Sequence, residues 1–579
     1  MNKHYKLIAF VALIALFLSV ACAPAATQPT SAPPTQAASA APTAAAPTQG
    51  ADTAPTQAAA TAPADAPGAT SKGPAGVLRL PLRPGVTVGS LWTAAGRHLD
   101  EAFLSGLAEV KWTADGVQPM LAKSWDMEDG GKAFVFHLRD DVKWSDGKPF
   151  TADDVLYTLN TYANPKVGAI HAGKLSDIVG YADVKDGKTE TLSGVTKVDD
   201  HTVRVELSTP TPLFVELKIP FVSILPAHIL SSVPADKLKG NDYWNNVVGT
   251  GPFIMTKMVQ DQLVEGVANP DYFEGKPKLD KVVYQVYADS NTMLAALEAG
   301  EIDGMLFQGG GIPVDQVARF EALPNLKVLG NMDAGLPTFM LINLNKDYFK
   351  DVRVRQAIMH AIDRQTIIDT VKLGTGTLSN TMFPMEWARA QDLTDYPYDP
   401  EKAKALLTEA GWDSSRKIDL QRYYTDQVNK DTVDAIAAQL QAVGINAVVR
   451  EVKSAEFQAS IDDDSLELAY AANGQGLDPS LGILVTGCGQ RLSVGYCNEE
   501  VDKLYAEGQS SADRAVRAPS YQKISKILNE ELPKGWLWWE VRPVAFDTRI
   551  VGLAEHFEEQ PLLLFDIPVY NQMHTWYTK

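Results

Sequence analysis

The sequence predicts an α/β protein made of more than one domain. The chain has 579 residues, of which 45% are hydrophobic and 21% charged, a balance typical of packed globular proteins. Its length exceeds the roughly 250–300 residues at which a single hydrophobic core stops growing. The pattern over 418–452 is typical of a strand, a helix and a second strand, which favours a partly parallel sheet.

Strands and a helix are predicted over 134–207. Phe134, Phe136 and Leu138 alternate with less apolar residues, as in a half-buried strand, and a similar alternation occurs over 203–207. Between them, Thr151 and Asp154 have the spacing of a capping box, which predicts that a helix begins there.

Two helices are predicted in the second half of the chain. Asp399 and Pro400 provide an N-cap and a first-turn proline for a helix over 401–410, which Gly411 ends. Within 418–452, Val433, Ile436, Leu440 and Val443 share one helix face. Gly444 ends that helix, and a strand follows over 445–452.

The first 22 residues predict a signal peptide rather than a part of the fold. Lys3 and Lys6 precede an apolar stretch over 7–20 that only Ser19 interrupts. As a helix, this stretch would reach about 21 Å, less than the ~30 Å of a bilayer's hydrocarbon core. We therefore expect an exported protein.

The segment Leu18-Ser-Val-Ala-Cys22 resembles a bacterial lipobox, although Ser19 stands where that pattern has Leu, Val or Ile. The resemblance implies that Cys22 carries lipid and becomes the mature N-terminus; ordinary cleavage after Ala21 is the alternative. In the following 48 residues, 38 are Ala, Pro or Thr, so they cannot bury enough apolar surface to fold. We expect a disordered tether over 23–74.

The composition argues against several classes of function. The formal charge is −19 and Lys and Arg form no run, which argues against nucleic-acid binding and against a surface that binds anionic lipid. Nine histidines without an i, i+4 pair predict no metal site. No catalytic constellation is apparent, and we expect neither an enzyme nor a bound cofactor.

A disulfide is predicted between Cys488 and Cys497. The chain has three cysteines, and lipidation of Cys22 leaves these two, separated by eight residues in an exported protein. Isolated buried thiols are the alternative.

Several blocks of the chain, read together, resemble the extracellular solute-binding proteins of family 5, the oligopeptide, dipeptide and nickel class that serves ABC importers. The most specific block is Val142-Lys-Trp-Ser-Asp-Gly-Lys-Pro-Phe-Thr-Ala-Asp-Asp-Val155. The others lie, in order, at 119–125, 134–139, 248–253, 269–277, 351–358, 361–364, 398–400, 410–412 and 498–504. Together they extend the resemblance over 75–579.

The resemblance implies a two-lobed fold of the periplasmic-binding-protein type, hinged around a cleft. Lobe I would be discontinuous, made of 75–335 and 546–579, with lobe II over 336–545. The protein would capture an extracellular solute and deliver it to ABC permease subunits. We expect a monomer that its lipid holds on the outer face of the cytoplasmic membrane, either in a periplasm or at the cell surface.

The identity of the solute stays open. In the family's peptide binders, an Asp four residues before the Pro of an Asp-Pro pair takes the peptide's ammonium group. Here that pair is Asp478-Pro479, and the matching residue is Gln475, which has no charge. An oligopeptide and an oligosaccharide or other neutral polar solute are therefore both expected, with a metal chelate as a lesser alternative. The candidate ligand-binding residues are Trp92, Trp387, Tyr424, Asn473, Gln475 and Asp478.

Two other classes of function are alternatives. A tethered surface hydrolase would need a converging nucleophile and base, which the sequence does not show. A receptor that signals to a membrane sensor is the other alternative, and the neighbouring reading frames would distinguish it from an import receptor.

Overall fold

The structure is a computed structural model. It describes residues 75–579 apart from 87, 89–90, 93–96, 111–116, 306–310, 473–477, 560–561 and 564–571. The predicted signal peptide, the lipidation site Cys22 and the tether lie outside the described residues. None of the helices in the described part of the chain is long and apolar enough to span a bilayer.

The largest sheet has the order β11-β17-β12-β16-β14-β15, with β13 on β17 and β19 on β12. Its strands β14 and β15 are parallel and are joined by helix α12, which confirms the predicted strand-helix-strand unit. The bounds of these elements are β11 Gly304–Met305, β12 Leu326–Ile342, β13 Gly376–Leu378, β14 Lys417–Arg422, α12 Gln427–Ala442, β15 Asn446–Glu451, β16 Leu468–Ala472, β17 Lys534–Asp547 and β19 Leu562–Leu563.

Two four-stranded sheets form the first part of the described chain, with the orders β1-β10-β9-β8 and β4-β5-β7-β6. Helix α2 packs beside the second of these sheets. The backbone N–H of Thr151 donates to Asp154 Oδ2 at 2.9 Å, so the predicted helix start is confirmed. The bounds are β1 Val77–Leu82, β4 Ala122–Glu128, β5 Ala133–Leu138, α2 Ala152–Ala163, β6 Val195–Asp199, β7 Thr202–Glu206, β8 Phe253–Val259, β9 Leu263–Ala268 and β10 Lys281–Val286.

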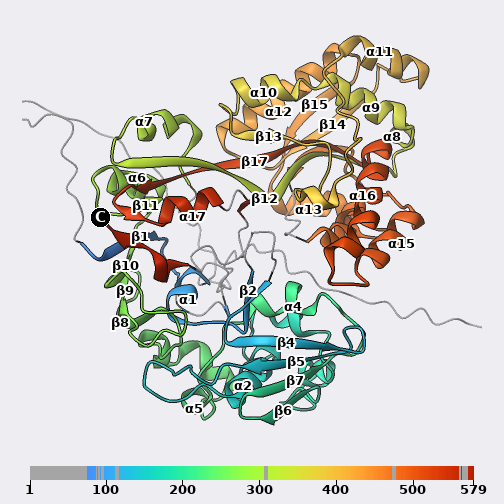
Figure 1. Cartoon of the computed structure of the whole chain (residues 1–579). Coiled ribbons are helices and arrows are strands. Elements are labelled where there is room, and N and C mark those ends of the chain that lie inside the picture. Colours follow the sequence, from blue (N-terminus) through green and yellow to red (C-terminus); the bar gives the residue numbers. More distant parts are fainter. Residues whose placement is uncertain are drawn as a thin grey trace, which may run out of the picture. The chain divides into compact units, whose positions relative to one another are not determined.

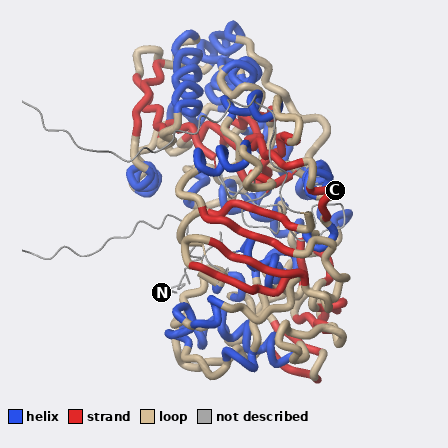
Figure 2. Tube along the Cα trace, turned by 90° about the vertical axis from the view of Figure 1, so that its left-hand side faces the viewer, coloured by secondary structure: helices blue, strands red, loops and turns tan. Residues whose placement is uncertain are grey.

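The other helices lie between and beside these sheets, and Figure 2 shows helices above and below the strands in the middle of its view. The predicted helix after Asp399 is present as α11, and Asp399 caps it. The bounds are α1 Arg97–Phe103, α3 Tyr181–Lys185, α4 Phe214–Leu217, α5 Ala227–Leu230, α6 Ser290–Glu298, α7 Val317–Glu321, α8 Asp347–Lys350, α9 Val352–Ala361, α10 Arg364–Thr370, α11 Pro400–Glu409, α13 Ser454–Asp462, α14 Ile483–Thr486, α15 Glu499–Gly508, α16 Arg514–Glu531 and α17 Leu553–Glu559. Two two-stranded sheets complete the set, β2 Ala108–Val110 with β3 Val117–Pro119 and β18 Ile550–Val551 with β20 Tyr577–Thr578.

Buried hydrophobic side chains form two large cores. The first draws on residues between Leu78 and Tyr284 and, from the far end of the chain, on residues between Val544 and Trp576. The second draws on residues between Phe339 and Trp538. The chain therefore leaves the first core, builds the second, and returns to the first.

Strands β12 and β17 connect these regions. They pair antiparallel along most of their length, from Leu326 opposite Asp547 to Leu341 opposite Lys534, and Figure 1 shows them side by side between α6–α7 and the helices around β14. The register is irregular between Met332 and Pro337. On both sides of that irregularity the pairing is between the same two strands, β12 and β17. Both cores therefore share these two strands.

Candidate functional site

The carboxyl ends of β14 and β16 lie at one edge of the large sheet because these strands are parallel. Tyr424 follows β14, and Ala472 ends β16. The backbone N–H of Ala472 donates to the Tyr424 hydroxyl at 3.2 Å, and the Tyr423 hydroxyl donates to it at 2.8 Å. Open α/β sheets bind ligands outside the carboxyl ends of their strands, so the predicted residue Tyr424 lies at the edge where a ligand is expected.

Aromatic rings continue from Tyr424 along this edge. The Tyr424 and Tyr470 rings are 5.8 Å apart between centroids, and Tyr470 and Trp538 are 6.2 Å apart. Burial raises the pKa of both tyrosines, and the nearby negative charge of Glu540 raises it further. Both hydroxyls therefore stay protonated and can donate as well as accept hydrogen bonds.

Glu540 follows Trp538 and Trp539 in β17 and is held by four hydrogen bonds. Its Oε1 accepts from the Thr338 hydroxyl at 3.1 Å, from Trp538 Nε1 at 3.0 Å and from Lys372 Nζ at 3.2 Å. Its Oε2 accepts from Lys372 Nζ at 2.9 Å. This carboxylate did not stand out in the sequence, where the only signal is a charged residue after an aromatic run.

A second group of residues gathers around Arg517 of α16. Its Nη2 donates to Asp478 Oδ1 at 2.6 Å, and its guanidinium carbon lies 5.3 Å from the centre of the Trp387 ring. The predicted residues Trp387 and Asp478 are thus brought together by an arginine that sequence reasoning missed. No local motif marks Arg517, because Asp478 lies 39 residues away along the chain and Trp387 lies further still.

Glu216 of α4 belongs to an element of the first core, yet it is close enough to this group to interact with it electrostatically. Burial raises the pKa of Glu216, the negative charge of Asp478 raises it further, and Arg517 and Arg514 oppose the shift. Its neighbours Phe214 and Val215 pack in the first core. Charged side chains from elements of both cores therefore lie within electrostatic range of one another here.

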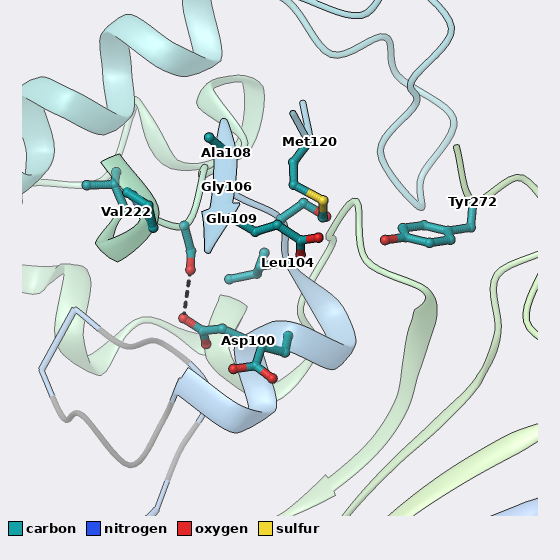
Figure 3. A pocket seen from close by; sticks show the side chains of 12 residues that line it. Asp100, Leu104, Gly106, Ala108, Glu109, Met120, Val222 and Tyr272 are labelled. Atoms are coloured by element: carbon teal, nitrogen blue, oxygen red, sulfur yellow. Dashed lines mark hydrogen bonds between the residues drawn. The ribbon is translucent and has the colours of Figure 1, made fainter. Parts of the chain in front are cut away.

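The segment that follows α4 lines a pocket. Its walls come mainly from α1, from β2 and the segment that leads into it, and from the segment after α4, with Met120 and Tyr272 added, and Figure 3 shows Asp100, Glu109 and the Tyr272 hydroxyl around it. Asp100 Oδ2 accepts a hydrogen bond from the Ser223 hydroxyl at 3.1 Å. Asp100 and Glu109 are 2% and 5% exposed. These acidic residues were not singled out from the sequence, because only folding brings the three segments together.

The remaining predicted residues lie elsewhere or cannot be placed. Trp92 packs edge-to-face on Trp244 at 5.0 Å, and its Nε1 donates to the Val167 carbonyl at 2.8 Å. Within the described part of the chain, no hydrogen bond or ring contact joins Trp92 to Tyr424, Trp387 or Asp478. Asn473 and Gln475 lie outside the described residues.

Cys488 and Cys497 form a disulfide, with an S–S distance of 2.10 Å. The loop that it closes is further held by Asp502, whose carboxylate accepts from the backbone N–H of Cys488. No group of three or more His, Cys, Asp or Glu that could hold a metal ion occurs among the residues that the structure covers.

Comparison with known proteins gives consistent matches. Residues 116–490 match the family model described as bacterial extracellular solute-binding proteins, family 5 Middle. A Brucella ovis protein that is provisionally named an ABC transporter peptide-binding protein is 31% identical over 72% of this chain and 78% of its own length. Heme-binding protein A of Haemophilus influenzae is 30% identical over 77% and 82%. The crystal structure of the ABC transporter substrate-binding protein CtaP of Listeria monocytogenes has a TM-score of 0.72 at 24% identity, covering 87% of this chain and 99% of that one.

Proposed function

This chain belongs to the bacterial extracellular solute-binding proteins, family 5, and we propose that it is the receptor of an ABC importer, which captures a solute outside the cytoplasm and delivers it to membrane permease subunits. As a member of that family, it is a solute-binding protein and not an enzyme. The two-lobed fold is shared with the solved structures of the family.

The two cores support the division that we propose, 75–335 with 546–579 for lobe I and 336–545 for lobe II, with Val544 of the second segment packing in the first core. Solute would bind where charged and aromatic residues of both lobes meet, and hinge motion in β12 and β17 would close the lobes around it. A closed form favoured by solute would be the state that the permease recognises.

We propose an oligopeptide as the solute class. The observation that carries this proposal is the row of aromatic residues at the carboxyl edge of the large sheet, where Tyr424, Tyr470 and Trp538 lie beside the Glu540–Lys372 pair. Aromatic faces and fixed hydrogen-bonding groups suit an extended backbone with varied side chains. The name of the Brucella ovis relative agrees with this solute class.

An uncharged polar solute, such as an oligosaccharide, is the second candidate. It is favoured by the pairing of Asp478 with Arg517, because a carboxylate whose charge is already compensated gains less from a peptide's ammonium group. The name of the Haemophilus influenzae relative shows that the family also contains a protein named for a solute that is not a peptide.

We further propose that Cys22 carries the lipid anchor and that 23–74 forms the tether between the membrane and lobe I. The composition of that segment supports this arrangement, because a chain of mostly Ala, Pro and Thr spans distance without folding. Metabolic labelling with a palmitate analogue, compared between the full chain and its Cys22→Ser variant, tests the anchor.

A thermal-shift screen of residues 75–579 tests the solute class. The arms are tripeptides with free amino ends, the same tripeptides with acetylated amino ends, and maltotriose. A ligand at 100 times its Kd adds ~2.7 kcal/mol to the stability of the folded form. A shift with either peptide pool supports the peptide proposal. A shift with maltotriose alone overturns it in favour of the second candidate, and no shift with any of the three argues against both solute classes.

A further inference from the structure

Glu540 combines a fixed position with access to solvent. Its carboxylate makes four hydrogen bonds, yet 24% of its side chain is exposed, whereas only 4% of the side chain of its counter-ion Lys372 is exposed. The buried Lys372 thus fixes the position of the Glu540 carboxylate, and part of the Glu540 side chain stays accessible to solvent. An acceptor held in this way loses little freedom when it binds a further donor.

The backbone around Glu540 is also unusual. In β12, Met332 is opposite Val541 and Pro337 is opposite Trp539, so four residues of β12 face the single residue Glu540 of β17. On its other side, Glu540 pairs with Gly376 of β13, which has no side chain. Glu540 therefore sits where the regular pairing of β12 and β17 is interrupted, next to the aromatic residues at the carboxyl edge of the sheet.

A second polar atom beside Glu540 is available. The Tyr470 hydroxyl is buried and makes no hydrogen bond with the described residues. Its ring lies 6.2 Å from that of Trp538, whose Nε1 donates to Glu540. Buried hydroxyl groups are nearly always paired, with protein or with an ordered water. An unpaired buried hydroxyl in the same aromatic group as a partly exposed carboxylate agrees with a further polar partner at this edge.

The charges at this place cancel. Lys372 compensates Glu540, and in the second group of residues Arg517 compensates Asp478 in the same way. A fully charged ammonium gains most from a carboxylate that has no counter-ion, whereas an O–H or an amide N–H needs only an accepting lone pair. The chemistry of this place therefore favours an uncharged donor.

From this geometry, and resting on the proposed function, we propose that Glu540 is a specificity-determining residue that accepts a hydrogen bond from an uncharged N–H or O–H group of the solute, and that Lys372 is its positioning residue. Backbone amides of a peptide and hydroxyl groups of a sugar share this chemistry. The site therefore does not require a free amino terminus on the solute.

Glu540→Gln tests the proposal, because it keeps the size of the side chain while it replaces one accepting oxygen with a donor. For whichever of the three probes above binds the wild type, calorimetry should show about ten- to hundred-fold weaker binding, as expected for loss of a hydrogen bond to a charged group. The matched control is Glu467→Gln. Glu467 precedes β16 at the opposite end of that strand and accepts from the Asp419 backbone N–H at 2.7 Å, so its variant should bind with unchanged affinity.

Three further measurements keep the test decisive. The double variant Lys372→Met/Glu540→Gln removes both charges, so it avoids an unpaired buried lysine and should fold while binding weakly. Lys372→Met should lose affinity for the solute, and Lys372→Arg, which keeps the positive charge, should retain it. This difference between the two variants is not expected if the pair matters only for stability. Wild-type affinity for acetylated tripeptides should lie within about threefold of that for free ones, since a neutral donor gains nothing from the amino-terminal charge.

The outcomes separate this inference from the function on which it rests. If the wild type binds a probe and Glu540→Gln binds it equally well, the role of Glu540 is overturned and the proposed function stands. If free tripeptides bind a hundredfold more tightly than acetylated ones, the uncharged donor is overturned. If no probe binds the wild type, the proposed solute classes are contradicted, and the role of Glu540, which rests on them, is overturned with them.

Discussion

Asp478 Oδ1 and Arg517 Nη2 are 2.6 Å apart, and the two side chains are only 15% and 3% exposed. The same guanidinium donates through Nε to the Gly508 carbonyl at 2.8 Å. Asp478 also caps the turn that follows it, since it accepts from the Ser480 backbone N–H at 2.9 Å. This pair therefore ties helix α16 to the segment after the large sheet's strand β16.

Removal of Arg517 should destabilise the protein strongly. Arg517→Met leaves the Asp478 carboxylate buried without its partner, which costs about 3–5 kcal/mol. The double variant Asp478→Asn/Arg517→Met keeps the capping oxygen and removes both charges, so it should recover part of that loss. Unfolding in urea measures both free energies, and equal losses in the two variants would contradict this account of the pair.

Tyr424 should contribute to solute affinity more than to stability. Tyr424→Ala removes the ring at the carboxyl edge, and loss of an aromatic contact of this kind weakens binding by about 0.5–1.5 kcal/mol beyond the buried area. Tyr398→Ala is the control, since Tyr398 is 49% exposed. Calorimetry with the probe that binds the wild type measures both variants; equal affinity in Tyr424→Ala and the wild type would remove Tyr424 from the site.

The disulfide should stabilise the loop that it closes. Cys488 and Cys497 are nine positions apart, and a loop of that size restricts the unfolded chain by an amount worth about 2–3 kcal/mol. The double variant Cys488→Ser/Cys497→Ser should lose that stability and keep its fold. Wild type treated with reductant should match the variant in urea unfolding, and a variant as stable as the oxidised protein would argue against the prediction.

Lys534 should make stability depend on pH above neutrality. Burial lowers the pKa of Lys534 to about 7, and its Nζ donates only to the Leu492 carbonyl at 2.7 Å among the described residues. The unfolded chain keeps this proton up to its ordinary pKa near 10.4. Between these values the unfolded state binds more protons, so the free energy of unfolding rises with pH, by up to about 1.4 kcal/mol per pH unit.

The variant Lys534→Met isolates that contribution. Its free energy of unfolding should increase less than that of the wild type between pH 7.5 and 9.5, because the shifted group is gone. Urea unfolding at three pH values in that range measures the slope for both proteins. Parallel slopes would show that Lys534 does not titrate in this window.

Local structure and family were predictable from the sequence, whereas the contacts of the site were not. The caps at Thr151 and Asp399 depend on residues within one helical turn, so their spacing predicts them. Arg517 meets Asp478 across 39 residues, and Lys372 meets Glu540 across 168. The packing of helices and strands brings such partners together. Neither Arg517 nor Glu540 lies in a local motif that indicates its role.

Tyr424 shows what an intermediate case looks like. Its place after a strand of the predicted strand-helix-strand unit indicated the carboxyl edge of a sheet, and the structure has it there beside Ala472. The same reasoning could not predict Glu540. It follows two buried tryptophans in a strand that packs in the core, where an accessible carboxylate is not expected.

The return of the chain to its first core has a consequence for synthesis and export. The backbone N–H of Gly76 donates to the Thr578 hydroxyl at 2.8 Å across 502 residues, and the first core needs side chains from Val544 to Trp576. Loop closure over such a separation comes late in folding. A nascent or translocating chain therefore cannot finish its first core until residues 544–576 have emerged. Molecules that lack residues 544–576 would leave apolar surface of the first core exposed, which favours their aggregation and proteolysis.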